Sequence, residues 1–185
     1  PPAIIKGSIR LKGRELLKLK DRQMQAVRGN QISMIFQEPM TSLNPVFSIG
    51  YQLSETLIKH QHLTKEQAWK RSIEMLRLAR VALPEQRMKE YPHQLSGGMR
   101  QRVMIAMATL GDPQVILADE PTTALDVSVQ AQVLNLINRL KKEFHFTYIF
   151  ISHDLSVVRF MSDRVVVMYN GKIQEMNEAD TLFNN

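Results

Sequence analysis

Cysteine is absent from the 185-residue sequence, which excludes disulfide bonds and metal sites built on thiolate ligands. Long apolar runs are absent as well, and no stretch approaches the roughly 20 residues that a membrane-spanning helix needs. Nothing in the given sequence has the pattern of a secretory signal peptide. We therefore expect a chain that suits a reducing compartment and does not cross a membrane by itself.

Aromatic residues are scarce at 6%, and no cluster of them forms a platform on which nucleic-acid bases could stack. The net charge is +6, but the Lys and Arg residues are scattered along the chain. A solvated basic surface is the favoured interpretation, and contact with acidic lipid headgroups or an acidic partner is the alternative. We expect no nucleic-acid partner.

The remaining composition is that of an ordinary globular protein. Hydrophobic residues make up 44% and charged residues 23%, which is enough for one domain, or one domain with a small insertion, around a real core. The sequence starts with Pro1-Pro2 and ends with "LFNN". We expect it to be a fragment of a longer protein.

Apolar strands alternate with helical patterns over much of the chain. "QISMIFQ", "PQVILADEP", "FTYIFISHD" and "RVVVMYNG" are short apolar segments, and "DVSVQAQVLNLINRLKK" is an amphipathic helix. Continuously apolar strands between helices predict an α/β fold with a covered, mainly parallel sheet. "GSIRLKGREL" predicts two short extended pieces around a Gly turn, and Asn170-Gly171 predicts a hairpin.

The stretch from Ile49 to about Tyr91 has a different pattern. Its apolar residues stand three and four positions apart, which predicts a mostly helical insertion. Thr64 and Gln67 have the spacing of a capping box. The segment "EPMTSLNP" that precedes this stretch predicts a loop.

"LSGG" stands in front of a basic, apolar helix. Ser96 can cap that helix, and Gly97 and Gly98 let the backbone approach a ligand closely. The free N–H groups and the helix dipole would suit a phosphate. A capped helix after a Gly turn is the alternative, and on these residues alone it is favoured.

Acidic residues and a histidine follow two of the apolar strands. Asp119 and Glu120 end "VILADE", where an aspartate can hold magnesium and a glutamate can polarise water; a solvated acidic strand end is the alternative. Asp126 begins the next helix, and alone it is more simply a helix cap. His153 ends "IFISH", where a lone histidine is usually structural; it would lie beside the acids if the two strands are neighbours.

Together these segments resemble the motifs of ATP-binding cassette (ABC) ATPases, in the family's order. "LSGGMRQR" resembles the signature motif, "VILADE" the Walker B strand, "ALD" the D-loop, "ISHD" the switch histidine, and "MIFQEP" the Q-loop with Gln37 as its glutamine. The resemblance covers essentially the whole chain. It implies a RecA-like P-loop NTPase core with a mostly helical subdomain, truncated at its N-terminus.

The resemblance also implies a division of the chain. Residues 1–48 would form a partial ATPase core with the Q-loop. Residues 49–95 would form the helical subdomain, continuing into the signature helix to about residue 110. Residues 111–185 would return to the core with Walker B, the D-loop and the switch histidine.

Within the family, "IFQEPMTSLNP" and "ADEPTTALDVSVQAQVLNLI" closely resemble ATPase subunits of oligopeptide, dipeptide and nickel importers. "VRGNQISMIFQEPM" and "NEADTLFNN" look most like the double-cassette peptide importers linked to microcin C uptake. The resemblance implies ATP and Mg²⁺ as cofactors and a peripheral position on the cytoplasmic face of the membrane. The implied partners are a second cassette bound head to tail, transmembrane permease subunits and, indirectly, a solute-binding protein.

Site residues follow from the same resemblance. Catalysis would rest on Glu120 and His153, and Asp119 with Gln37 would organise magnesium. The signature residues would act on the nucleotide held by the partner cassette, and Asp126 would link the two sites. The implied nucleotide-binding residues are Gln37, Ser96, Gly97, Gly98, Gln101 and Asp126.

The sequence departs from the family in one essential place. It contains no G-x-x-x-x-G-K-[ST] phosphate-binding loop; Gly171-Lys172 is followed by Ile173. Asn177 also stands where many relatives have Gly. We therefore expect that the chain as given neither binds ATP tightly nor hydrolyses it. A soluble cassette ATPase of DNA repair or translation, or a non-catalytic module, remain the alternatives.

Overall fold

The computed structural model describes residues 6–37, 42–123 and 125–184, and the predicted loop at "EPMTSLNP" lies partly outside them. At its centre is a three-stranded parallel sheet in the order β3 (Ile32–Ile35), β4 (Val115–Asp119) and β5 (Thr147–Ile151). Asp119 pairs with Ile151 in the register of β4 and β5. The predicted parallel sheet is confirmed: Asp119 ends one strand, and His153 follows its neighbour.

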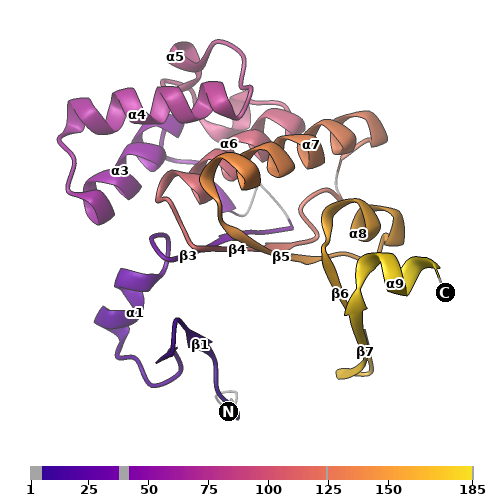
Figure 1. Ribbon diagram of the computed structural model, residues 1–185. Helices are drawn as coiled ribbons and strands as arrows, with labels where there is room; N and C mark the ends of the chain where they lie inside the picture. The colour runs from indigo at the N-terminus through magenta and orange to yellow at the C-terminus, as the bar shows by residue number, and fades with distance from the viewer. Residues whose placement is uncertain (1–5, 38–41, 124, 185) are drawn as a thin grey trace.

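A layer of helices packs on one face of this sheet (Figure 1). It contains α3 (Ile49–Gln61), α4 (Lys65–Leu78), α5 (Pro84–Arg87), α6 (Gly97–Leu110) and α7 (Val127–Phe144). The predicted helical stretch is therefore confirmed, and so is its capping box, since Gln67 N donates to Thr64 Oγ1 and Thr64 N to Gln67 Oε1.

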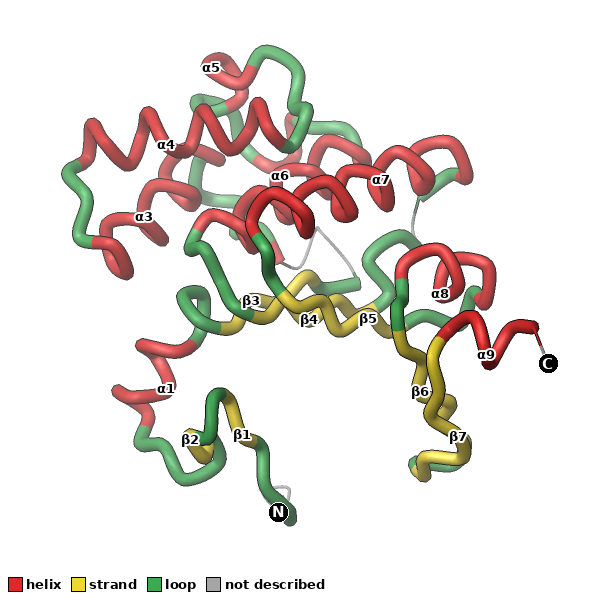
Figure 2. Tube along the Cα trace, viewed as in Figure 1, coloured by secondary structure: helices red, strands yellow, loops and turns green. Residues whose placement is uncertain are grey.

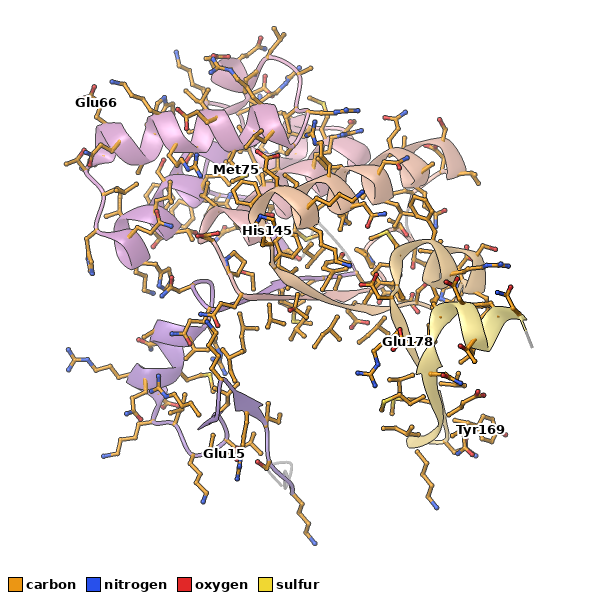
Figure 3. All side chains as sticks on the ribbon, in the orientation of Figure 1. Glu15, Glu66, Met75, His145, Tyr169 and Glu178 are labelled. Carbon is orange, nitrogen blue, oxygen red and sulfur yellow. The ribbon has the colours of Figure 1, made fainter. Side chains whose placement is uncertain are left out.

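The core lies between the sheet and the helices. Ile116 and Ala118 of β4 are buried, together with apolar residues of all the longer helices. Met75, labelled in Figure 3, is a fully buried residue of α4. This burial explains why the apolar periodicity of the helical stretch could be recognised in the sequence.

The opposite face of the sheet differs from the prediction. We expected a covered sheet, but in the described part of the chain the helices cover one face only (Figure 2). Side chains on the other face are exposed: Met34 by 39%, Ile149 by 50% and Ile151 by 55%. A run of apolar residues along a strand therefore predicts that both faces of the sheet are apolar. It does not predict which elements pack against each face.

Smaller elements lie at the two ends of the chain. Near the N-terminus are the hairpin of β1 (Arg10–Leu11) and β2 (Arg14–Glu15), and helix α1 (Asp21–Val27), which sequence reasoning missed. Near the C-terminus are α8 (Leu155–Met161), β6 (Arg164–Tyr169), β7 (Lys172–Glu178) and α9 (Ala179–Asn184).

β6 and β7 form the predicted antiparallel hairpin. Asn170 and Gly171 both have positive φ, at 47° and 72°, as a two-residue turn of this kind requires. The hairpin forms a sheet of its own and points away from the helical layer, with Tyr169 near its tip (Figure 3).

No helix in the described ranges combines the length and the apolar character that a membrane span requires.

Candidate functional site

Glu120 lies at the carboxyl end of β4, where the chain leaves the sheet. Its N–H donates to the carbonyl of Ile151 in β5 at 3.0 Å. Its φ is +44°, a left-handed conformation that a glutamate adopts at a cost in free energy. The neighbouring strand and the turn that follows therefore hold Glu120 in a conformation that it would not favour alone.

The carboxylate of Glu120 is the centre of a hydrogen-bonded cluster. Gln37 Nε2 donates to Oε2 at 3.0 Å, and Thr123 Oγ1 donates to the same oxygen at 3.0 Å. His153 Nδ1 lies 2.9 Å from Oε1. Gln37 follows β3, Glu120 follows β4 and His153 follows β5. These three side chains thus meet at one edge of the sheet, together with Thr123 from the turn after Glu120.

These contacts shift the acid–base equilibria of the pair. Hydrogen bonds from His153 and Thr123 lower the pKa of Glu120. The hydrogen bond and the negative charge of Glu120 raise the pKa of His153. Both shifts favour a carboxylate beside an imidazolium.

Asp119 lies at the last position of β4, beside this cluster in the sequence. The described residues contain no group of three or more acidic, histidine or cysteine side chains suited to a metal ion. Mg²⁺, however, is commonly held by one or two carboxylates together with phosphate oxygens and water. Because the amide nitrogen of Gln37 bonds Glu120, its side-chain oxygen is the atom that suits a cation. The carboxylate of Asp119 and the side-chain oxygen of Gln37 therefore fit a magnesium ion whose remaining ligands are phosphate oxygens and water.

A second candidate site lies at the N-terminus of α6. Ser96 caps this helix, because its Oγ accepts from Met99 N at 3.3 Å. Asp126 caps α7 in the same way, with Oδ1 accepting from Val129 N at 2.9 Å. The simple helix-cap interpretation of both residues is thus confirmed, and the caps bring the two side chains to one hollow.

The hollow has a volume of about 400 Å³ and is lined by residues of α6, α7 and the loop before α7. Its lining residues are Ser96, Gly97, Gly98, Met99, Arg102, Leu125, Asp126, Val129 and Gln132. None of them belongs to the cluster around Glu120. The two candidate sites are therefore separate within one chain.

The two glycines of this hollow serve different purposes. A Cβ at Gly97 would meet no atom within 4 Å, so open space faces it. A Cβ at Gly98 would lie 2.9 Å from Val129 Cγ1. Gly97 therefore leaves room for a ligand, whereas Gly98 permits α6 to approach α7.

Gln101 is not brought to either site. Its side chain is buried, with 1% exposed, and its amide donates to the carbonyl of Pro121. It thereby connects α6 to the turn that follows Glu120. Its assignment as a nucleotide-binding residue stays a prediction.

Sequence reasoning missed Thr123 and Arg102. Thr123 stands three positions after Glu120, which is the spacing of a turn, and that spacing is the signal that could have found it. Arg102 lines the hollow, donating to Ala79 O and Gln132 Oε1. Burial, and then Arg80 and Arg139, lower its pKa.

Comparison with known proteins gives a consistent result. Residues 2–123 match the family model described as "ABC transporter". The oligopeptide transport ATP-binding protein OppD of Bacillus subtilis is 50% identical over 184 residues, 99% of this chain and 51% of that protein. OppD of Salmonella typhimurium is 51% identical over 97% of this chain and 53% of its own length.

A third relative is the peptidoglycan transport ATP-binding protein YejF of Agrobacterium fabrum, 51% identical over 96% of this chain and 32% of that protein. The chain thus spans about half the length of the OppD relatives.

Among solved structures, the ATP-binding cassette MJ0796, a dimer in a post-hydrolysis state bound to ADP and Pi, superposes with a TM-score of 0.82. The match has 29% sequence identity and covers 94% of this chain and 74% of that one. The fold thus agrees with that of an ATP-binding cassette.

Proposed function

Since this chain belongs to the ABC transporter family, we propose that it is part of the ATP-binding and ATP-hydrolysing subunit of an importer for peptides. One observation carries the proposal: Gln37 and His153, far apart in the sequence, both bond the carboxylate of Glu120 at the carboxyl ends of parallel strands. Ligands of open α/β sheets bind at this edge.

The chemistry proposed for this cluster is hydrolysis of ATP: water attacks the γ-phosphate, the bond to the β-phosphate breaks, and ADP and inorganic phosphate leave. Glu120 orients and polarises the water, and His153 contacts the γ-phosphate and senses its loss. Asp119 and Gln37 would hold the magnesium ion, whose charge neutralises phosphate oxygens. Phosphoryl transfer depends mainly on positioning and charge stabilisation, which these residue types supply.

The hollow at α6 would bind the nucleotide of a second cassette. It is separate from the Glu120 cluster, and Gly97 leaves space in front of the N-terminus of the helix, where an anion is stabilised. Ser96, Gly97 and Gly98 would act on the partner's γ-phosphate, with Asp126 linking the two sites. The description of MJ0796 as a dimer supports a second cassette as the partner, and we propose that it binds head to tail.

Peptides are the proposed cargo because the relatives at about 50% identity are named for oligopeptide and peptide transport. Nickel, and a double-cassette parent of the microcin C type, are finer alternatives. Permease subunits would anchor the protein at the cytoplasmic face of the membrane. A solute-binding protein would deliver the peptide to the permease on the opposite side. Nothing in the described ranges of the chain favours a role in DNA repair or translation.

Measuring ATP hydrolysis and peptide uptake for the protein as its gene encodes it would test the proposal. We expect magnesium-dependent hydrolysis that Glu120→Gln abolishes, together with loss of peptide uptake. Glu143→Gln, the same chemical change at an exposed site near the end of α7, is the matched control and should leave both unchanged. Unchanged hydrolysis in Glu120→Gln would contradict the assignment.

The chain as given should show no tight ATP binding and no turnover, because it lacks the G-x-x-x-x-G-K-[ST] loop. Magnesium-dependent turnover by the chain alone, sensitive to Glu120→Gln, would refute this expectation.

A further inference from the structure

The Glu120 carboxylate has three side-chain hydrogen-bond partners, and in the proposed function two of them also bind the nucleotide or its metal ion. Gln37 would coordinate magnesium and His153 would contact the γ-phosphate. Either task draws the side chain toward the nucleotide. Thr123 has no such duty, and its hydroxyl bonds Oε2 of Glu120 at 3.0 Å.

Thr123 also holds the main chain of Glu120. Its N–H donates to the carbonyl oxygen of Glu120 at 3.3 Å, which closes a turn between the two residues. The same residue thus binds both the backbone and the carboxylate of Glu120. Because Glu120 has a φ of +44°, its direction depends on contacts of this kind.

The turn that carries Thr123 is itself anchored. Pro121 and Thr122 are buried. The amide of Gln101 bonds the carbonyl of Pro121, and Gln130 Nε2 donates to Thr122 Oγ1 at 3.3 Å. Thr123 itself is exposed, as is His153, whose side chain is 70% exposed. The main chain of Thr123, however, directly follows two buried residues that are bonded to α6 and α7, so the hydroxyl of Thr123 starts from an anchored backbone.

We propose that Thr123 is the positioning residue of Glu120. Its hydroxyl keeps the carboxylate aimed at the water while Gln37 and His153 engage the nucleotide. This inference rests on the proposed function, because it assumes that Glu120 acts on water.

The test compares Thr123→Val, which keeps the shape but removes the hydroxyl, with Thr123→Ser, which keeps the hydroxyl. Both are made in the protein as its gene encodes it. We expect Thr123→Val to lower kcat about tenfold, as loss of one hydrogen bond to a charged group implies. KM for ATP and the melting temperature should stay unchanged, and Thr123→Ser should recover most of kcat.

Thr147→Val is the matched control. It removes a hydroxyl from the exposed first residue of β5, at the end of the strand opposite His153, and kcat should remain within about twofold of the parent. In the Glu120→Gln background, Thr123→Val should cause no comparable further loss, because the two residues act as a unit. A rise in KM at constant kcat, parental kcat in Thr123→Val, or failure of Thr123→Ser to recover activity would overturn the proposal.

A crystal structure with bound nucleotide supplies a readout that does not depend on turnover. We expect Thr123 Oγ1 within hydrogen-bond distance of Glu120 Oε2 in the parent, and more than one orientation of Glu120 in Thr123→Val. A parent in which Thr123 has left Glu120 would overturn the inference even if the enzyme is active. Absence of ATP hydrolysis in the parent would instead count against the proposed function.

Discussion

The two candidate sites differ in what holds their functional groups. At the carboxyl ends of the central strands, Gln37 and His153 each bond the carboxylate of Glu120. At the hollow, Ser96 and Asp126 bond the backbone of the helices that they begin. The first set can be altered without removing a contact that the fold requires, whereas the second set serves fold and ligand together. Substitutions should therefore separate activity from stability at the first site and combine them at the two capping residues of the second.

The largest expected effect is that of Glu120→Gln. Loss of the carboxylate that activates water should reduce ATP hydrolysis by about 100-fold or more, in line with general-base catalysis. The melting temperature should change little, because the side chain lies at the surface end of the strand. Thermal unfolding is measured alongside the kinetic assay. A large drop in melting temperature would contradict the claim that this site can be altered without loss of stability.

The next effect is that of Gly98→Ala. The new Cβ would lie 2.9 Å from Val129 Cγ1, and a β-branched side chain in a helix has little freedom to rotate away. Overpacking of this kind should cost about 1–3 kcal/mol of unfolding free energy. Gly97→Ala, which meets no neighbour, should unfold like the parent and yet lower nucleotide-dependent activity.

The double variant Gly98→Ala with Val129→Ala sharpens this result. Removing the methyl groups of Val129 should recover part of the lost stability. A double variant as unstable as the sum of the two single variants would show that the contact is not the cause.

Removing a helix cap should have a smaller effect. Asp126→Ala leaves Val129 N without its acceptor and should cost about 1 kcal/mol of unfolding free energy. Asp126→Asn retains an oxygen acceptor and should unfold close to the parent. His153→Ala, at the other site, should leave the stability nearly unchanged. Denaturant unfolding of the three variants decides whether the contrast between the sites holds.

The smallest effect concerns proton binding. His153 should titrate at a higher pH than His60, because Glu120 raises the pKa of His153 while burial and Lys59 lower that of His60. The stability from the His153–Glu120 pair is then fully present between about pH 4.5 and pH 6.5. It is lost as the pH rises through the raised pKa of His153 and as the pH falls through the lowered pKa of Glu120. An NMR titration measures the pKa values of His153 and His60, and Glu120→Gln should lower the pKa of His153.

The positions of several site residues could be predicted from local signals, whereas their roles in the proposed site came from the family resemblance. Apolar strands that end in Asp119, Glu120 and His153 imply a common sheet edge once the strands are parallel. Ser96 and Asp126 have the residue types of helix caps, and both are caps.

Other features left no comparable signal. Val27 is the only buried residue of α1, so that helix has no apolar periodicity to recognise. Gln101 looks like a surface residue of a basic helix, but its burial depends on the tertiary contact with Pro121. Thr123 becomes significant only when the turn brings its hydroxyl to Glu120. The division into residues 1–48, 49–95 and 111–185 stays a proposal.

The exposed face of the sheet has a consequence for handling the chain in solution. Ile149 and Ile151 present apolar surface, and β5 is the terminal strand of the described sheet. Two molecules that meet along this strand can extend each other's sheet. A net charge of +6 opposes that encounter, and salt screens the repulsion. Attraction between molecules should therefore become stronger as the ionic strength is raised. It is measured as an increase, with protein concentration, in the light scattered per unit mass of protein.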